Sequence, residues 1–123
     1  MALEARKYGN ATVVKLVGRL DHDNCDAVRA DIIAALERAG GGAVLVLDLS
    51  RLSYVSSAGL RCFMLVSRQA KAQQGRLLAA AAQPMVGEIF EISRFNLLFP
   101  IYQTLREALA AVSSEAAEAF DGA

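Results

Sequence analysis

The sequence has few of the residues that build metal sites, disulfide frameworks and hydrolytic active sites. It contains one histidine, His22, and two cysteines, Cys25 and Cys62, among 123 residues. The cysteines lie in different segments without a CxxC spacing or a histidine cluster, so we expect free thiols and no metal site. We expect no cofactor either, because the sequence has no GK[ST] phosphate loop, no GxGxxG and no HExxH motif.

Net charge and long apolar runs are lacking too. Thirteen basic residues balance thirteen acidic ones, so no overall field favours nucleic acid or an anionic membrane. No apolar run approaches the roughly 20 residues that a membrane span needs, and Glu4, Arg6 and Lys7 at the N-terminus are unlike a signal peptide. We therefore expect a cytoplasmic protein of one domain, with no membrane insertion and no direct nucleic-acid binding.

Apolar stretches of two kinds alternate along the chain. Continuous apolar runs, such as 43–49, are typical of strands buried on both faces. Val28, Ile32 and Leu36 recur instead at helical spacing, after Asp23 or Asn24 as a helix cap. We expect strands at residues 3–8, 13–18, 43–49, 77–82 and 97–102. Helices are expected from the cap at Asp23 or Asn24 to Ala39, over 57–74, and from Pro84 and Leu105 onward.

The last part of the chain carries further signals. Pro100 within the final expected strand indicates an edge of the sheet, because proline cannot donate to the strand ladder. Thr104 and Glu107 fit a capping box at the start of the last expected helix. Residues 113–123 are small and acidic, so we expect a folded domain over 1–112 followed by a frayed tail.

Strands that alternate with helices indicate a single α/β domain. We expect a mostly parallel sheet of four to five strands packed with about four helices. Right-handed crossovers place the strand-to-helix loops at one edge of such a sheet, where function tends to lie in open α/β folds. The loop at 21–24 should therefore lie near Ser56 and Ser57, and also near Gln83 and Gln103.

Ser56 and Ser57 stand between an expected strand and an expected helix. A nucleophilic serine occupies this place in α/β hydrolases, but it needs a base, and those hydrolases place histidine last in the chain. His22 comes first here. The candidate lysines, expected near the terminus, in mid-strand and far along the helix, are Lys7, Lys15 and Lys71. We therefore expect no catalytic residue and no enzymatic activity.

A helix cap and a phosphate acceptor are the other two interpretations of these serines. One serine at a helix start accepts a first-turn N–H and stabilises the helix by about 1 kcal/mol, which leaves the second hydroxyl without a role. A phosphoserine would place about two negative charges at the positive helix end, where the fold tolerates them. An apolar or acidic partner would then be repelled, the more so beside Asp21 and Asp23. Gly59 indicates that another group approaches this helix closely.

A longer stretch resembles a known family. Residues 48–61, DLSRLSYVSSAGLR, are similar to the signature of STAS domains, specifically of the anti-sigma-factor antagonists, also called anti-anti-sigma factors. That family has a strand ending in Asp-Leu-Ser, a short hydrophobic loop, and then Asp-Ser-Ser-Gly-Leu-Gly or a variant such as Ser-Ser-Ala-Gly-Leu-Arg. Further similar segments follow in the right order, so that the resemblance covers roughly residues 10–112; they are 17–21, 83–95, 100–102 and 105–109.

The resemblance implies a phosphorylation switch. In this family the serine just before the small residue and glycine is phosphorylated, which makes Ser57 the expected acceptor. The kinase is the anti-sigma factor itself, which uses ATP and magnesium. The unphosphorylated antagonist binds it and frees the sigma factor, the phosphorylated form lets go, and a phosphatase resets the switch. Ser56 replaces the acidic residue that usually precedes the acceptor, which makes Ser56 the second choice of acceptor. Arg61 replaces a glycine.

The resemblance and the expected loop cluster together predict a partner-binding surface on a monomer or weak dimer. Its expected residues are Asp21, Asp23, Asn24, Tyr54, Val55, Ser56, Ala58, Gly59 and Arg61. The alternative function is a phosphorylation-independent STAS subunit of a stress-sensing scaffold or of a membrane transporter complex. Such a subunit would bind its partner regardless of Ser57→Asp. A module for a nucleotide or lipid has no motif behind it.

Overall fold

The computed structural model describes residues 3–123. In chain order its elements are β1 (Glu4–Tyr8), β2 (Ala11–Leu20), α1 (Cys25–Ala39), β3 (Val44–Val55), α2 (Ser57–Ala72), β4 (Arg76–Ala80), α3 (Pro84–Ile92), the 3-10 helix η1 (Phe95–Leu97), β5 (Ile101–Tyr102), α4 (Leu105–Val112) and α5 (Ser114–Asp121). This alternation confirms the predicted α/β fold class.

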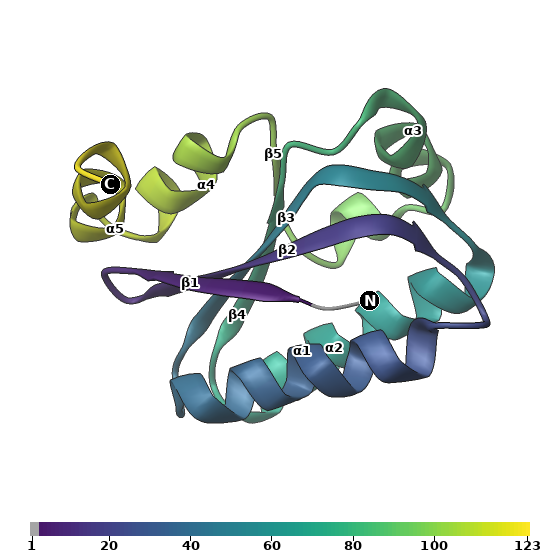
Figure 1. Cartoon of the computed structure of the whole chain (residues 1–123), viewed down its shortest axis with the longest axis horizontal. Coiled ribbons are helices and arrows are strands. Elements are labelled where there is room, and N and C mark those ends of the chain that lie inside the picture. Colours follow the sequence, from purple (N-terminus) through teal and green to yellow (C-terminus); the bar gives the residue numbers. More distant parts are fainter. Residues whose placement is uncertain (1–2) are drawn as a thin grey trace.

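The five strands form one sheet in the order β1-β2-β3-β4-β5 (Figure 1). As predicted, β2 to β5 run parallel, whereas β1 pairs antiparallel with β2. The sheet is therefore mixed, because a two-residue turn at Gly9 and Asn10 joins β1 to β2, and a connection this short requires antiparallel strands. Gly9 has a φ of +59°, a conformation that glycine adopts without steric cost.

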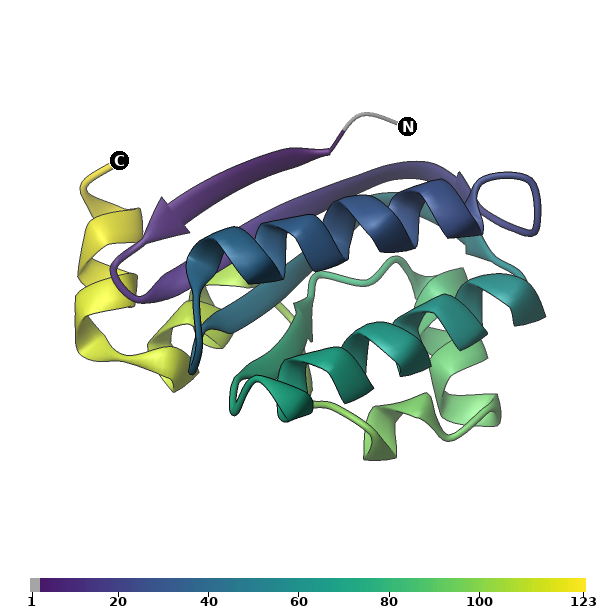
Figure 2. The same ribbon diagram turned by 90° about the horizontal axis from the view of Figure 1, so that it is seen from below.

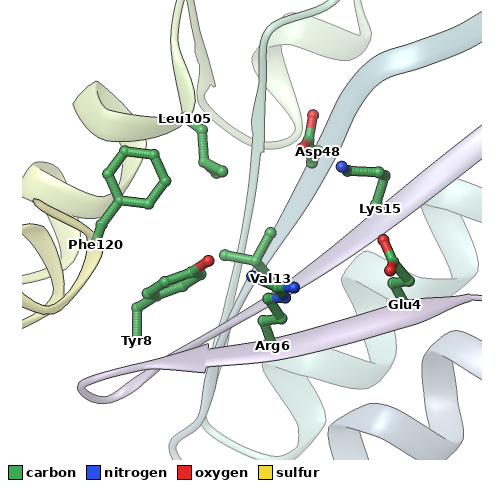
Figure 3. Close-up of a pocket in the computed structure, with 8 residues that line it drawn as sticks. All are labelled: Glu4, Arg6, Tyr8, Val13, Lys15, Asp48, Leu105 and Phe120. Atoms are coloured by element: carbon green, nitrogen blue, oxygen red, sulfur yellow. The ribbon is translucent and has the colours of Figure 1, made fainter. Parts of the chain in front are cut away.

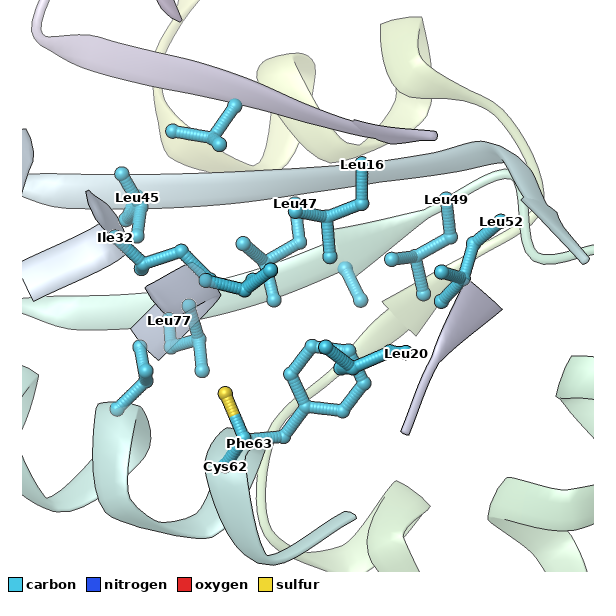
Figure 4. Close-up of a cluster of buried hydrophobic side chains, with 14 of the residues drawn as sticks. Leu16, Leu20, Ile32, Leu45, Leu47, Leu49, Leu52, Cys62, Phe63 and Leu77 are labelled. Atoms are coloured by element: carbon cyan, nitrogen blue, oxygen red, sulfur yellow. The ribbon is translucent and has the colours of Figure 1, made fainter. Parts of the chain in front are cut away.

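Helices cover both faces of the sheet (Figures 1 and 2). Since α1, α2 and α3 connect consecutive parallel strands, right-handed crossovers place them on one face. Their apolar side chains and those of the strands form the larger core, which includes the fully buried Leu16, Leu47 and Phe63 (Figure 4). On the other face, α4 and α5 pack over smaller side chains such as Ala11 and Val46.

The strands β2 and β3 extend well beyond the rest of the sheet. β3 pairs with β4 only over residues 44–48, but it pairs with β2 as far as Val55. Residues 50–55, which we expected as a loop, therefore continue the strand. The register with β2 shifts near Ser50, whose N–H donates a hydrogen bond of 3.0 Å to the Asp48 carboxylate. A bulge of this kind bends a strand and breaks its side-chain alternation.

This extension corrects the predicted grouping of loops. The loop after β4 lies beside the middle of β3, where Gln83 Nε2 donates to the Ser50 carbonyl at 2.8 Å. Gln103 follows β5, whose Tyr102 pairs with Ala80 at the end of β4. Neither glutamine therefore joins the loops that follow β2 and β3, because β4 and β5 end several residues before those longer strands do.

The expected strand at 97–102 is mostly not a strand. The helix η1 covers Phe95–Leu97, and β5 consists only of Ile101–Tyr102. Pro100 lies just before β5, and its carbonyl accepts a hydrogen bond from Ala79 N–H at 2.9 Å. Because β5 is the outermost strand on this side, the edge position inferred from the proline is confirmed.

The helices lie close to where the sequence predicts them. α1 buries Val28, Ile32 and Leu36, as its periodicity indicates. The Thr104 hydroxyl accepts a hydrogen bond from Glu107 N–H at 3.1 Å, which confirms the cap of α4. Among residues 3–123, none of these helices combines the length and the apolar character that crossing a membrane requires.

Residues 113–123, where we expected a frayed tail, contain the helix α5. The Ser113 hydroxyl caps this helix by accepting a hydrogen bond from Ala116 N–H at 3.0 Å. Ala116 is fully buried against the sheet, and the Phe120 ring packs edge-on against Tyr8 with 5.4 Å between centroids. The small residues that suggested fraying instead allow α5 to approach the first two strands closely.

Candidate functional site

The ends of β2 and β3 bring two loops together. Ser56 N–H donates to the Leu20 carbonyl at 2.9 Å, so the loop after β2 lies beside the start of α2. We call this surface the serine rim, and it comprises residues 21–24 and 56–61. It unites the two segments that we expected to meet at the carboxyl edge of the sheet.

The two serines of the rim differ in their contacts. Ser56 is the N-cap of α2, and its hydroxyl accepts a hydrogen bond from Gly59 N–H at 3.2 Å. Ser57 is the first residue of the helix and is exposed. Within residues 3–123, no hydrogen bond engages the Ser57 hydroxyl. Ser56 therefore provides the cap, and the Ser57 hydroxyl is left available to solvent or to a partner.

Gly59 makes the close packing of this corner feasible. A Cβ atom at this position would lie 2.7 Å from the Leu20 carbonyl oxygen and 2.9 Å from Val55 Cγ1. Such distances are shorter than real Cβ contacts, so the close approach predicted for Gly59 is confirmed. Val55 and Gly59 are both buried. The sequence predicts both as partner-contacting residues, but their burial means that they support the serine rim from beneath.

The loop at 21–24 is held by its own polar side chains. The Asp21 carboxylate accepts from Asp23 N–H at 3.0 Å, and the Asn24 carbonyl oxygen accepts from Asp21 N–H at 2.9 Å. Asn24 Nδ2 also donates to the Arg19 carbonyl at 2.7 Å. Asn24 is the N-cap of α1 by position, but its side chain does not cap that helix. The expected cap is therefore wrong, because the loop uses this amide instead.

Tyr54 is half-buried beneath an arginine that we did not predict. The Arg19 guanidinium carbon lies 4.3 Å from the centre of the Tyr54 ring, a cation–π arrangement. Arg19 Nε also lies 3.8 Å from an Asp21 carboxylate oxygen. Arg19 and Tyr54 are paired across β2 and β3 only because the register shifts between Gly18 and Arg19. Because the sequence does not reveal this register shift, it does not predict the contact between Arg19 and Tyr54.

The start of α2 favours an anion at Ser57. The first helical turn has N–H groups without acceptors within the helix, and the helix dipole is positive there. No acidic residue occupies the first turn of α2, so this positive end is not neutralised by its own helix. Arg61 follows Ser57 by four positions and is exposed, which places both side chains on one face of α2.

The candidate lysines lie away from the serines: Lys7 is in β1, Lys15 is in mid-β2 opposite Asp48, and Lys71 is in the last turn of α2. His22 belongs to the serine rim, but its Nε2 lies 3.2 Å from Asp23 Oδ1. In the part of the chain that the structure describes, no hydrogen bond joins any of them to Ser57. This geometry gives no support to a nucleophilic serine.

The hollows among the described residues include no deep pocket at the serine rim. A hollow of about 350 Å³ lies away from the serines, on the sheet face that carries α4 and α5 (Figure 3). Its lining includes Arg6, Lys15 and Asp48. The recess beside the start of α2 measures only about 80 Å³, well below the volume of a typical small-molecule pocket. The rim is thus an open surface, suited to contact with a macromolecule.

Comparison with known proteins identifies the family. The family model described as the Mlab STAS domain matches residues 3–106. BtrV of Bordetella bronchiseptica, a candidate anti-sigma factor antagonist, is 39% identical over 111 residues, which cover 90% of this chain and 93% of BtrV. The chain is a STAS-domain protein of the anti-sigma factor antagonist family. The resemblance read from residues 48–61 is therefore confirmed.

Solved STAS structures share the fold. The anti-sigma factor antagonist SpoIIAA in its unphosphorylated form is 26% identical, with a TM-score of 0.72 over 90% of this chain and 96% of that one. The Bacillus cell fate determinant SpoIIAA in its phosphorylated form has a TM-score of 0.67 at 24% identity, over 90% and 99% of the two chains.

Proposed function

We propose that this protein binds a kinase-type anti-sigma factor through the serine rim and is released when Ser57 is phosphorylated, which regulates the availability of a sigma factor in the cytoplasm. The observation that carries the proposal is the exposed Ser57 hydroxyl. It lies at the positive end of α2 and takes no part in capping that helix. SpoIIAA, solved in phosphorylated and unphosphorylated forms, supports the same kind of switch.

A phosphate on Ser57 is compatible with the folded protein. It would carry about two negative charges and three acceptor oxygens, beside first-turn N–H groups that lack helical acceptors. Arg61, one turn further along, can add a charge-assisted hydrogen bond. The same phosphate would lie beside the loop that carries the exposed Asp23. An apolar or acidic partner surface on the rim would therefore lose affinity, while the antagonist itself stays folded.

The capping role of Ser56 favours Ser57 as the acceptor. Ser56 is half-buried, and its hydroxyl accepts from Gly59 N–H. Phosphorylation there would have to displace this hydrogen bond at the start of α2. Ser57 presents no such obstacle. Although Ser56 replaces the acidic residue that often precedes the acceptor in this family, the division of roles between the two serines still favours the second.

The accessible part of the rim defines the proposed partner contact. The predicted contact residues that remain at least partly exposed are Asp21, Asp23, Asn24, Tyr54, Ser56, Ala58 and Arg61. They combine carboxylates, an arginine and one aromatic side chain on a surface without a deep pocket. The phosphorylating partner would be a serine kinase that uses ATP and magnesium, and a separate phosphatase would restore binding.

The test compares binding of three variants to the partner. Wild type, Ser57→Ala and Ser57→Asp serve as tagged baits in a native extract, and the captured anti-sigma factor is then purified for titration calorimetry. Like charge at an interface costs several kcal/mol, so Ser57→Asp should weaken binding on the order of 100-fold. Ser57→Ala should bind like wild type and resist release by ATP and magnesium.

The chain offers a matched control for the added charge. Ser114 is the exposed first residue of α5 and follows a capping serine, Ser113, which is the local arrangement of Ser57 after Ser56. Ser114→Asp should leave the Kd unchanged within about twofold, because α5 packs beside β1 and not at the serine rim. Equal affinity of Ser57→Asp and wild type would contradict the switch and favour a constitutive scaffold or transporter subunit.

A further inference from the structure

The two cysteines, far apart in the sequence, lie in one place in the structure. Cys25 is the first residue of α1, and Cys62 lies in the second turn of α2. Both line the recess of about 80 Å³ between these helices, beside Ala58 and Arg61 of the serine rim. Both are free thiols. The fold therefore brings together two cysteines that lie in different segments of the sequence.

The two thiols differ in exposure. Cys25 is half-exposed, and its Sγ lies 3.9 Å from the His22 carbonyl as a weak donor. Cys62 is 3% exposed, and Figure 4 shows its sulfur directed into the core. Burial, and then proximity to Cys25, raise the pKa of the Cys62 thiol to about 12. An oxidant from solvent therefore reaches Cys25 first, while Cys62 is shielded.

We propose that Cys25 and Cys62 form a reversible disulfide when the protein meets a hydroperoxide. The peroxide transfers one oxygen to the Cys25 thiolate, which becomes a sulfenic acid, and an alcohol or water leaves. The Cys62 sulfur gives up its proton and attacks the Cys25 sulfur. The S–S bond forms as the S–O bond breaks, and hydroxide leaves and takes up that proton as water. Two electrons pass from the thiols to the peroxide.

The cross-link would tie α1 to α2 directly beneath the serine rim. It would join the residue that follows the loop at 21–24 to the helix that carries Ser57. This covalent step depends only on the two cysteines, so it stands or falls independently of the proposed function. Its effect on partner affinity, by contrast, rests on that function.

Peptide mapping of the full chain tests the proposal. The purified protein is treated with hydrogen peroxide, its remaining thiols are alkylated, and it is digested with trypsin without reduction. Cleavage after Arg19, Arg29, Arg61 and Arg68 releases Cys25 in residues 20–29 and Cys62 in residues 62–68. We expect these two peptides joined by a disulfide in monomeric protein, and their separation after dithiothreitol.

Two variants check the order of events. In Cys62→Ala, Cys25 should accumulate as a sulfenic acid that dimedone traps, and circular dichroism shows whether this core substitution has preserved the fold. In Cys25→Ser, which changes a half-exposed side chain, Cys62 should stay reduced under the same peroxide treatment. Over-oxidised Cys25 or Cys25–Cys25 dimers in the wild type, with no joined peptide, would overturn the proposal.

The pH dependence gives a second readout. Groups that face Cys62 in the recess are Cys25, Asp26 and Arg29 of α1 and Arg61 of its own helix. Since the pKa of Cys62 is about 12, its thiolate fraction grows with pH throughout the neutral range. The step from sulfenic acid to disulfide should therefore accelerate about tenfold from pH 7 to pH 8. A rate that does not change with pH would contradict attack by Cys62.

Discussion

Ser56 and Ser57 are neighbours in the sequence, and in the structure only Ser56 caps α2. The Ser56 hydroxyl caps α2, so Ser56→Ala should lower the free energy of unfolding by about 1 kcal/mol. Ser57→Ala removes only an exposed hydroxyl and should change it by less than about 0.5 kcal/mol. Urea denaturation of both variants measures the difference. Equal losses in the two variants would contradict the assignment of the cap to Ser56.

Gly59 offers a test of the close packing beneath the rim. Alanine is the better helix former by about 1 kcal/mol, but its Cβ would lie 2.7 Å from the Leu20 carbonyl oxygen. Gly59→Ala should therefore lower the free energy of unfolding by about 1–3 kcal/mol. The control is Gly87→Ala in α3, where a Cβ meets nothing within 4 Å. That variant should be neutral or more stable in the same denaturation series.

The sequence indicated the position of the candidate site but not the orientation of each side chain. The pattern of residues 48–61 located the two serines, and the presence of two hydroxyls suggested that only one was needed as a cap. Which serine caps depends on the backbone angles of Ser56, with φ −84° and ψ 175°, and no residue pattern specifies them. The burial of Val55 likewise depends on the path of β3.

Among secondary-structure elements, β3 shows that a bulge can remove the alternating sequence pattern by which a strand is predicted. Residues 50–55 lack a regular alternation of apolar and polar side chains, because the register with β2 shifts twice along this segment. The hydroxyl of Ser53 then donates to the Gly18 carbonyl at 3.0 Å beside the second shift. Periodicity indicates strands only where pairing is regular. The sequence therefore does not predict that residues 50–55, which lead into the serine rim, belong to β3.

The helix α5 was missed because the small and acidic residues of 113–123 resemble a frayed tail. It makes a contact that can be tested. Arg106 donates two hydrogen bonds to the Asp121 carboxylate, at 2.9 and 2.8 Å. The hydrogen bond from Arg106 lowers the pKa of Asp121. Because the folded pKa lies below the unfolded one, the pair stabilises docked α5 at neutral pH and is lost as the pH falls through the lowered value.

Asp121→Asn should therefore loosen α5 without unfolding the domain. Since the pair is exposed, we expect amide hydrogen exchange in α5 to be only about two- to fivefold faster at pH 7. In the wild type, the protection of the α5 amides relative to their intrinsic exchange rates should fall in the same way as the pH drops through the lowered pKa of Asp121. The control is Glu118→Gln, an exposed acid of α5 that makes none of the ion pairs found among residues 3–123. Equal acceleration in both variants would contradict the contact.

For the chain as a whole, the fold class was predictable because strands and helices alternate and are separated by recognisable turn and cap residues. The parallel order, the three crossover helices on one face and the edge strand beside Pro100 all follow from that alternation. The unequal lengths of the strands did not follow from it. They separate Gln83 and Gln103 from the serine rim, and they leave the loops after β2 and β3 together at one end of the sheet.

The most direct measurement is the location of phosphate on the peptide of residues 52–61, LSYVSSAGLR, which trypsin releases between Arg51 and Arg61. The protein is incubated with native extract, ATP and magnesium, and the peptide is sequenced by fragmentation mass spectrometry. We predict one added phosphate, located on Ser57, that requires ATP and is absent from Ser57→Ala. An unmodified peptide in an extract that phosphorylates its other serine-kinase substrates, or phosphate on Ser56 instead, would contradict the proposed switch.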